Sequence, residues 1–382
     1  MSETPILNLE VDVPQARKSG RALVNYLALV PPVVVFALLS PDLPRNNLVY
    51  LLPALYLGVV VHELGHAIAG KLAGLDVGGI CIGGFMFVRS GDRWVFRFSL
   101  RWLLNMGGFV VPLPESGEFP RSRFALFVAA GPVASILLAA ISRILMIREA
   151  DQAGDWIATL WWASVLLIVV SVTPFSIQGM RSDGMVLWRL FRKPESMRTM
   201  MNFLALRTAD VNGVRPRDWD PASLRAALGT REDEPYYPMA QIYAWYRCVD
   251  QRDEAAGLPY LENALRAAAE RGSAVMLRSC FGLAAAASAS TLGNVEQARV
   301  WLDRARKTGR PTGEESSEGV EARMAMIEGR YEDAMRHWAA LRDHIAKKKY
   351  GNSGTILYLK ARIEEGENEC RSAMSRAEGA AG

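Results

Sequence analysis

The stretch that decides the fold runs from Leu48 to Leu72 and reads LVYLLPALYLGVVVHELGHAIAGKL. Its first fourteen residues carry no charge, and the run is long enough to cross a bilayer as one helix. Near its far end, His62, Glu63 and His66 form the pattern H-E-x-x-H. Residues four apart lie on one face of a helix, so the two imidazoles can take adjacent corners of a tetrahedral zinc site. Glu63 would then stand beside the ion as a general base.

A helix surface with two solvated histidines and a glutamate is the alternative interpretation of this motif. That interpretation suits a soluble helix, whereas this one is apolar on all sides. An ionisable group at mid-membrane costs about 2.5–3.5 kcal/mol on insertion scales, and such groups are functional by default. The sequence therefore favours a metal site with one zinc ion per chain.

The chain has 382 residues, enough for two or three domains. Residues 1–195 contain 17 Lys/Arg and 14 Asp/Glu, and the remainder contains 27 and 26. This small excess should orient membrane helices, and we expect no nucleic-acid partner. The cysteines are scattered without disulfide-framework spacing. The polar first twenty residues precede an apolar run that is too long for a cleavable signal peptide, so none is expected.

We expect a mainly α-helical polytopic membrane protein with a soluble α-helical domain. A cytoplasmic arm (1–20) precedes an intramembrane core (21–195), and a cytoplasmic helical domain (196–382) follows. The four expected spans are about 22–40, 48–72, 124–147 and 157–173.

Basic residues are concentrated in the arm, in 71–123 and after Pro174. The positive-inside rule therefore puts both termini in the cytoplasm and His62 in the cytoplasmic half of its helix. The protein should be integral to the bilayer.

Residues 73–120 differ from the spans because they are rich in glycine and in alternating aromatic and basic residues. Ser90-Gly91-Asp92 lies between two alternating runs and predicts a β-hairpin. The apolar run from Leu100 to Val111 is too short to span, and we expect it to dip into the membrane.

The tail from residue 196 is alanine-rich and contains two similar segments. One begins GNVEQA at Gly293 and the other begins GRYEDA at Gly329, an offset of 36 residues. This offset is close to the tetratricopeptide period and predicts a short tetratricopeptide-like array. A plain α-helical bundle is the alternative. An earlier copy near 253–265 fits poorly, because Pro259 should interrupt its helix.

A third metal ligand is expected directly after the fourth span. Asp183 is followed by Gly184, which permits a tight turn. Pro174 should end the span, so that Asp183 can lie on irregular backbone at membrane depth. A surface Asp-Gly turn is the commoner fate of this dipeptide. The intramembrane H-E-x-x-H motif and the cytoplasmic position favour a ligand instead.

The sequence resembles the site-2 protease family of intramembrane zinc metalloproteases (peptidase family M50) over about residues 20–190. The matching segments are the HELGH run at 62–66, Ala130-Gly131-Pro132, and Pro174-Phe175 up to Ser182-Asp183-Gly184. The resemblance implies that His62, His66 and Asp183 bind zinc and that Glu63 activates water. Ser171 stands where the family usually has an Asn, and the spacing from Pro174 to Asp183 is longer than the common form.

The function that follows is zinc-dependent endoproteolysis in or near a transmembrane segment of a membrane-protein substrate, in a bacterial inner or plasma membrane. A cytoplasmic regulator or substrate region would bind residues 196–382. Two alternatives stay open. One is a membrane-anchored adaptor whose metal site has no proteolytic role, and the other is a protease that clips cytosolic segments or peptides.

Overall fold

The structure is a computed structural model of the chain. It describes residues 48–91, 93–98, 107–148, 155–177, 180–232, 234, 236–271, 274–308, 317–347 and 351–381. The described residues divide into two compact units. The membrane unit comprises 48–89 and 94–208, and the helical unit comprises 90–93 and 209–381. The N-terminal arm and the expected span at 22–40 lie outside the described residues.

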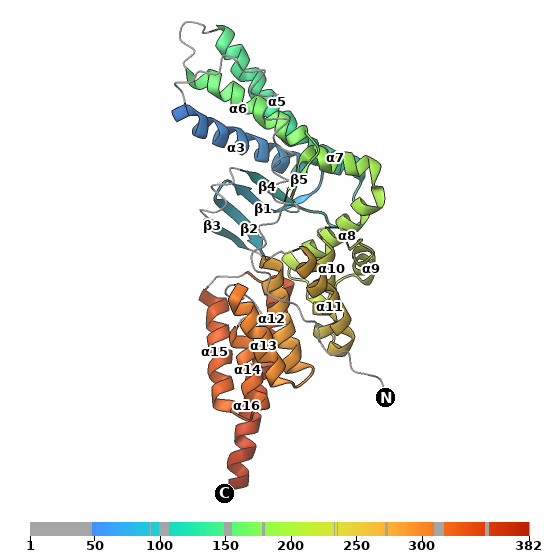
Figure 1. Cartoon of the computed structure of the whole chain (residues 1–382), viewed down its shortest axis with the longest axis vertical. Coiled ribbons are helices and arrows are strands. Elements are labelled where there is room, and N and C mark those ends of the chain that lie inside the picture. Colours follow the sequence, from blue (N-terminus) through green and yellow to red (C-terminus); the bar gives the residue numbers. More distant parts are fainter. Residues whose placement is uncertain are drawn as a thin grey trace. The chain divides into compact units, whose positions relative to one another are not determined.

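Three helices of the membrane unit are long and apolar enough to cross a bilayer. They are α3 (Leu48–Leu72), α5 (Arg121–Arg148) and α6 (Asp155–Val172). All three were expected, and their ends differ from the predicted bounds by three residues or fewer. The protein is therefore mainly helical with three candidate spans in the described part of the chain (Figure 1).

Small residues let these three helices approach one another closely. A Cβ added at Gly65 on α3 would lie 2.7 Å from the carbonyl oxygen of Ala130 and 2.7 Å from the Cβ of Ala134, both on α5. A Cβ at Gly58 would lie 2.5 Å from the Leu167 side chain on α6. Close backbone approach of this kind is typical of helix packing in membranes. Helix α3 is thereby held against both neighbours at the level of its histidine motif.

The segment after α3 forms a four-stranded antiparallel sheet in the order β3-β2-β1-β4. Its strands are β1 (Asp76–Ile82), β2 (Phe85–Ser90), β3 (Arg93–Phe98) and β4 (Gly108–Leu113). The predicted β2–β3 hairpin is confirmed, and Gly91 at its tip has a φ of +64°. The sheet adjoins α3, where the rings of Tyr56 and Phe85 lie edge to face with their centroids 6.2 Å apart.

The run expected to dip into the membrane ends in a strand. Residues 108–111 belong to strand β4. They pair with β1, where Val110 lies opposite Ile80 and Gly108 opposite Ile82. This pairing joins residues far apart in the sequence, so apolar composition alone does not reveal it. Residues 100–106 lie outside the described residues.

A tight connection links α6 to the helix that follows. A two-stranded ribbon of β5 (Ser176–Ile177) and β6 (Met180–Arg181) leads into α7 (Asp183–Arg192), and α8 (Pro194–Val211) continues the chain. The Ser182 hydroxyl donates to the Thr173 carbonyl at 2.6 Å and accepts from the backbone N–H groups of Phe175 and Met185. Ser182 is thus the N-cap of α7 and also ties it to the end of α6.

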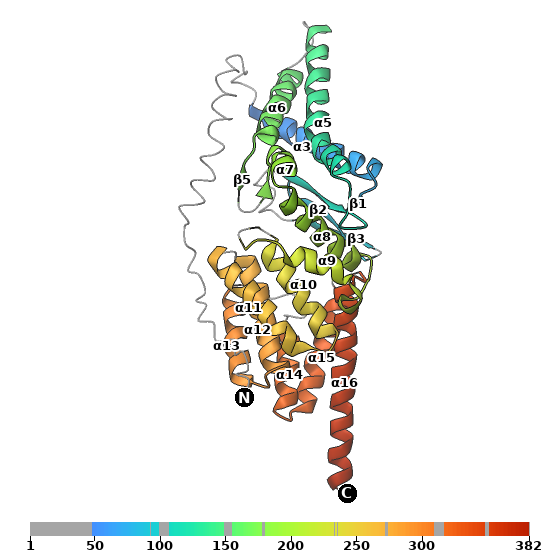
Figure 2. The same ribbon diagram turned by 90° about the vertical axis from the view of Figure 1, so that its right-hand side faces the viewer.

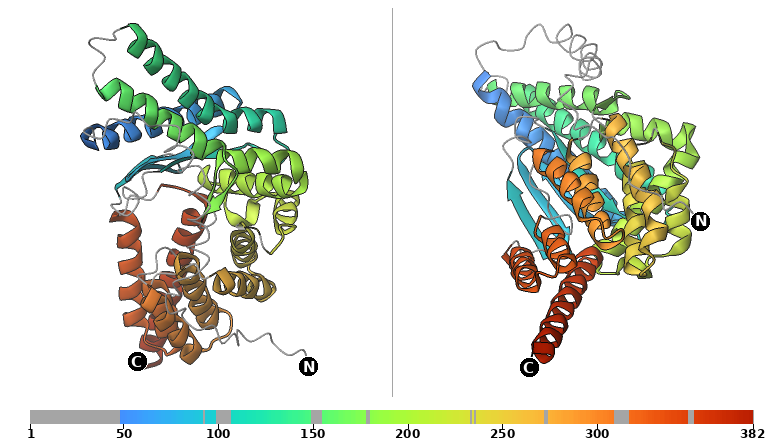
Figure 3. Two further views of the ribbon diagram at one scale, coloured as in Figure 1. Left: turned by 45° about the horizontal axis from the view of Figure 1, so that its top comes forward. Right: turned by 60° about the horizontal axis from the view of Figure 1, so that its bottom comes forward.

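The helical unit contains three consecutive helix pairs and a long closing helix (Figures 2 and 3). A short 3-10 turn, Pro216–Asp218, and α9 (Pro221–Leu228) precede them. The pairs are α10 (Tyr237–Asp250) with α11 (Glu254–Arg271), α12 (Ala274–Ser290) with α13 (Val295–Thr308), and α14 (Ser317–Ile327) with α15 (Tyr331–Lys347). Helix α16 (Gly354–Ala381) closes the unit, and its last turns extend beyond the neighbouring helices (Figure 2).

The turns inside these pairs share one backbone feature. Gly293 and Gly329, 36 residues apart, have φ values of +62° and +73°. Arg252, between α10 and α11, has a φ of +67° although it is not a glycine. Pro259 does not interrupt its helix, so that expectation was wrong: α11 runs through it, anchored by the buried side chains of Leu258 and Leu261. Tertiary packing outweighs the local cost of proline here. The helix pairs do not by themselves identify tetratricopeptide repeats.

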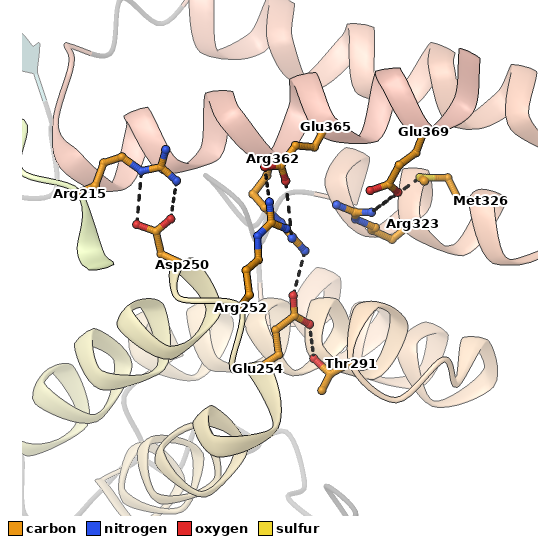
Figure 4. A network of polar contacts seen from close by, with 10 residues as sticks. All are labelled: Arg215, Asp250, Arg252, Glu254, Thr291, Arg323, Met326, Arg362, Glu365 and Glu369. Carbon is orange, nitrogen blue, oxygen red and sulfur yellow. Dashed lines mark hydrogen bonds and ion pairs between the residues drawn. The ribbon is translucent and has the colours of Figure 1, made fainter. Parts of the chain in front are cut away.

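Ion pairs attach α16 to the turns of the helix pairs (Figure 4). Arg362 pairs with Glu254 at 3.1 Å, and Glu254 also accepts a hydrogen bond from Thr291 at 2.8 Å. Arg252 pairs with Glu365 on α16. These partners come from different helices, so the network orients α16 along the pairs.

Candidate metal centre

Three metal-ligand side chains meet between α3, α5 and the start of α7. Nε2 of His62 lies 3.1 Å from Oδ2 of Asp183, and Nε2 of His66 lies 3.3 Å from Oδ1 of Asp183. The two Nε2 atoms are 3.2 Å apart. Both histidines are buried, with 7% and 6% of their surface exposed. In the described part of the chain, these three residues are the group able to hold a metal ion.

The spacing of these atoms fits zinc. Zinc binds histidine nitrogen and carboxylate oxygen at about 2.0–2.2 Å, so two ligand atoms on a tetrahedral ion lie roughly 3.3–3.6 Å apart. The observed separations of 3.1, 3.2 and 3.3 Å lie at or just below the lower end of that range. Two imidazoles and one carboxylate also match the ligand types of catalytic zinc sites, which keep a fourth position open.

The outer nitrogens of both imidazoles are held by α5. Nδ1 of His66 lies 2.8 Å from the carbonyl oxygen of Phe127, which can only accept a hydrogen bond. Nδ1 of His66 therefore carries a proton, and Nε2 faces the other two ligands. Nδ1 of His62 lies 2.9 Å from the Ser135 hydroxyl. Such outer partners fix the orientation of metal-binding histidines and raise their basicity.

Gly131 leaves the space in which the ion would lie. It stands on α5 between Phe127 and Ser135, four residues from each. A Cβ added there would lie 2.7 Å from Nε2 of His62 and would collide with Nε2 of His66. Any side chain at residue 131 would take up space beside both Nε2 atoms that a bound ion would need.

Glu63 is buried beside the two histidines, with 5% of its surface exposed. Its Oε2 atom has no hydrogen-bond partner in the part of the chain that the structure describes. A buried carboxylate oxygen without a partner is costly, and its persistence points to a functional role. Strand β4 approaches this side chain, because a Cβ on Gly108 would lie 2.5 Å from Cγ of Glu63 and 2.6 Å from its Oε1.

The carboxyl group of Asp183 is kept ionised by its partners. Burial raises the pKa of this carboxyl, but the hydrogen bonds from His62 and His66 outweigh burial, so the pKa lies below its usual value. Helix α7 begins at Asp183 behind its Ser182 cap. An ionised carboxylate at a fixed helix start is a suitable ligand for a cation.

The structure brings together all four residues that the sequence singled out. His62, Glu63 and His66 share α3, and Asp183 joins them from α7. The sequence interpretation named Gly131 only within the Ala130-Gly131-Pro132 segment and missed Phe127 and Ser135, although the spacing of four residues is the signature of one helix face. Gly108 was also missed, because its contact with Glu63 depends on the pairing of β4.

The comparisons with known proteins agree with this geometry. The model of Peptidase family M50 matches residues 50–334. The match begins in α3, contains all the residues of the centre and continues into α15, so it ends well beyond residue 190, where the sequence resemblance was expected to end. Neither a search of curated proteins nor a search of solved structures finds a match. With three-quarters of its length covered by that model, the chain belongs to peptidase family M50, a family of metallopeptidases.

Proposed function

We propose that this protein is a zinc-dependent intramembrane endopeptidase of the site-2 protease type, which hydrolyses a peptide bond in or near a transmembrane segment of another protein. One observation carries the proposal: ligand atoms of His62, His66 and Asp183 lie at zinc-ligand spacing on and beside a helix long enough to cross a bilayer. A single zinc ion would be held by these three residues. When bound, it supplies a Lewis acid that activates water and polarises a carbonyl.

Glu63 is the proposed general base. Its buried carboxylate takes one proton from the attacking water as the new carbon–oxygen bond forms, and then gives that proton to the leaving amine nitrogen as the carbon–nitrogen bond breaks. Ser135 and the Phe127 carbonyl act on the histidines, because their hydrogen bonds hold both imidazoles with Nε2 facing inward. Neither residue would touch the substrate.

Strand β4 is the proposed support for the substrate. A transmembrane helix shields its own carbonyls by hydrogen bonding, so it must be locally extended before attack. β4 is an edge strand of the sheet, and Gly108 approaches Glu63. A substrate segment that pairs with β4 in the manner of an added strand would bring its carbonyl groups to Glu63. The absence of a side chain at residue 108 leaves room for this approach.

A substitution that preserves shape tests the proposal. Glu63→Gln retains all three ligands but removes the base, so zinc content should stay near one per chain while cleavage falls at least about 100-fold. Glu118→Gln, at an exposed carboxyl of the same unit, is the matched control and should cleave like the wild type. Purified variants would be reconstituted in vesicles with a panel of single-span membrane proteins, with zinc measured by atomic absorption.

The same panel separates the two alternatives. Cleavage of soluble peptides alone would identify a protease that clips cytosolic segments. A protein that binds zinc but cleaves nothing, with Glu63→Gln indistinguishable from the wild type, would favour a membrane-anchored adaptor. Purely structural zinc sites are closed by four protein ligands, whereas this group has three, which argues against the adaptor.

A further inference from the structure

Helix α7 begins where α6 ends. Gly184, in its first turn, packs so tightly on α6 that a Cβ there would collide with the carbonyl oxygen of Val172. The Ser182 hydroxyl binds the Thr173 carbonyl at 2.6 Å, next to the last residue of α6. Because α6 can cross a bilayer, the start of α7 lies at the level where this crossing ends. Ten residues are too few for a second crossing.

The side chains of α7 divide into a buried and an exposed set. Leu190 is buried, with 3% of its surface exposed, and it anchors the helix to the membrane unit. Trp188 and Phe191, three residues apart and on one face, are 46% and 76% exposed. Arg192 and Lys193 follow directly and are also exposed. Helix α7, whose start is fixed to the spanning helix α6, thus exposes aromatic and basic side chains next to one another.

The surroundings of this surface favour lipid as its partner. Helix α7 packs on α5 and α6, both candidate spans, so its exposed face continues a surface that lipid covers. The acidic residue on α7 is Asp183, which the two histidines hold, and Glu195 on α8 has Arg198 within 3.9 Å. Arg192 and Lys193 therefore leave a local positive charge. Aromatic residues flanked by arginine and lysine are the composition of helices that lie in the interface with anionic lipids.

We propose that α7 is an interfacial anchor: Trp188 and Phe191 insert at the boundary between headgroups and acyl chains, and Arg192 and Lys193 bind the phosphates of anionic lipids. The anchor depends on α6 crossing the membrane and is independent of proteolysis. It gives the metal centre a direct attachment to one leaflet, because Asp183 is the first residue of the same helix.

A fluorophore at residue 191 tests the insertion. Phe191→Cys would be labelled with the nitrobenzoxadiazole dye in full-length protein and reconstituted in vesicles of phosphatidylcholine and phosphatidylglycerol. Cys81, Cys280 and Cys370 are buried, and Cys248→Ala removes the remaining partly exposed thiol. Insertion about 5–10 Å deep predicts quenching by doxyl-labelled lipid and protection from aqueous iodide. Val300→Cys, 51% exposed on α13, is the matched control and should show the opposite pattern.

Lipid charge tests the basic residues. In vesicles of phosphatidylcholine alone, the dye at residue 191 should be quenched less by doxyl lipid and more by iodide. The double change Arg192→Gln and Lys193→Gln should have the same effect in the mixed vesicles and should abolish the difference between the two lipid compositions. Equal quenching in both lipid compositions for the labelled protein with Arg192 and Lys193 unchanged would overturn the headgroup contact.

Two further outcomes would overturn the anchor as a whole. Quenching of residue 191 by iodide as strong as that of residue 300 would show that the face lies in water. Protection from both quenchers would show that protein covers it, either residues 1–47 or a second copy of the chain.

Discussion

Replacing Gly131 with alanine should disable the metal centre without weakening the fold. The new Cβ would lie 2.7 Å from Nε2 of His62, whereas ordinary van der Waals contact begins near 3.4 Å. The His62 ring must therefore move away by about 0.7 Å, and the His66 ring must also move. Metal sites tolerate deviations of only about 0.2 Å in their metal–ligand distances. Two of the three ligands are displaced together. We expect zinc affinity to fall at least about 100-fold. Loss of one hydrogen-bond partner behind a metal ligand lowers metal affinity by about 100-fold at most, and here the ligands themselves move.

The helix itself should not suffer from this change. Alanine is a better helix former than glycine by about 0.8–1 kcal/mol, so loss of zinc could not be attributed to an unravelled α5. Ala140→Val, on the exposed side of the same helix, adds more volume away from the site and should leave zinc binding unchanged. Zinc affinity would be measured by competition with a chromophoric chelator, and helix content by circular dichroism. A Gly131→Ala protein that binds zinc as tightly as the wild type would refute the assignment of this space to the ion.

Three further predictions concern the outer partners, the topology and the helical unit. Ser135→Ala removes the hydrogen bond to His62 and should lower zinc affinity about 10–100-fold in the same competition assay; unchanged affinity would show that Ser135 does not orient the imidazole. A reporter fused after Gly382 should read as cytoplasmic and one inserted after Asp151 as external. The reverse result would place every loop on the opposite side of the membrane. Deleting 209–382 should leave zinc binding and cleavage of a short model substrate intact. Cleavage of the native substrate should fall about 100-fold or more, because the helical unit would no longer concentrate that substrate at the membrane unit. Loss of zinc on truncation would instead show that the helical unit is part of the catalytic core.

The parts of the centre that sequence predicts are those set by local geometry. His62 and His66 share a helix face at a spacing of four, and that relation holds wherever the helix lies. Asp183 could be added because it follows an apolar run closely and stands before a glycine. These inferences needed only a helix period, a span length and the residue types that bind zinc.

The parts that sequence did not predict depend on contacts between distant segments. Ser135 and Phe127 bind the histidines only because Gly65 lets α3 and α5 approach closely at one register. Two apolar helices can pack at many registers, so the sequence alone does not identify this one. Strand β4 looks like an apolar membrane run until its pairing with β1 is known. Pro259 argues against a helix by a local rule, but buried leucines on either side of it outweigh that cost.

The separation of the metal ligands along the chain has a consequence for synthesis. Asp183 follows His62 by 121 residues, and α5 and α6 lie between them. A chain still leaving the ribosome holds two ligands on one helix and lacks the third until both later helices have entered the bilayer. A two-ligand site binds zinc weakly, so under the proposed function the nascent protein would lack protease activity during its insertion into the membrane. On the proposed function, the protein can become active only after Asp183, the first residue of α7, has been made, and a product truncated before this residue could not cleave neighbouring proteins.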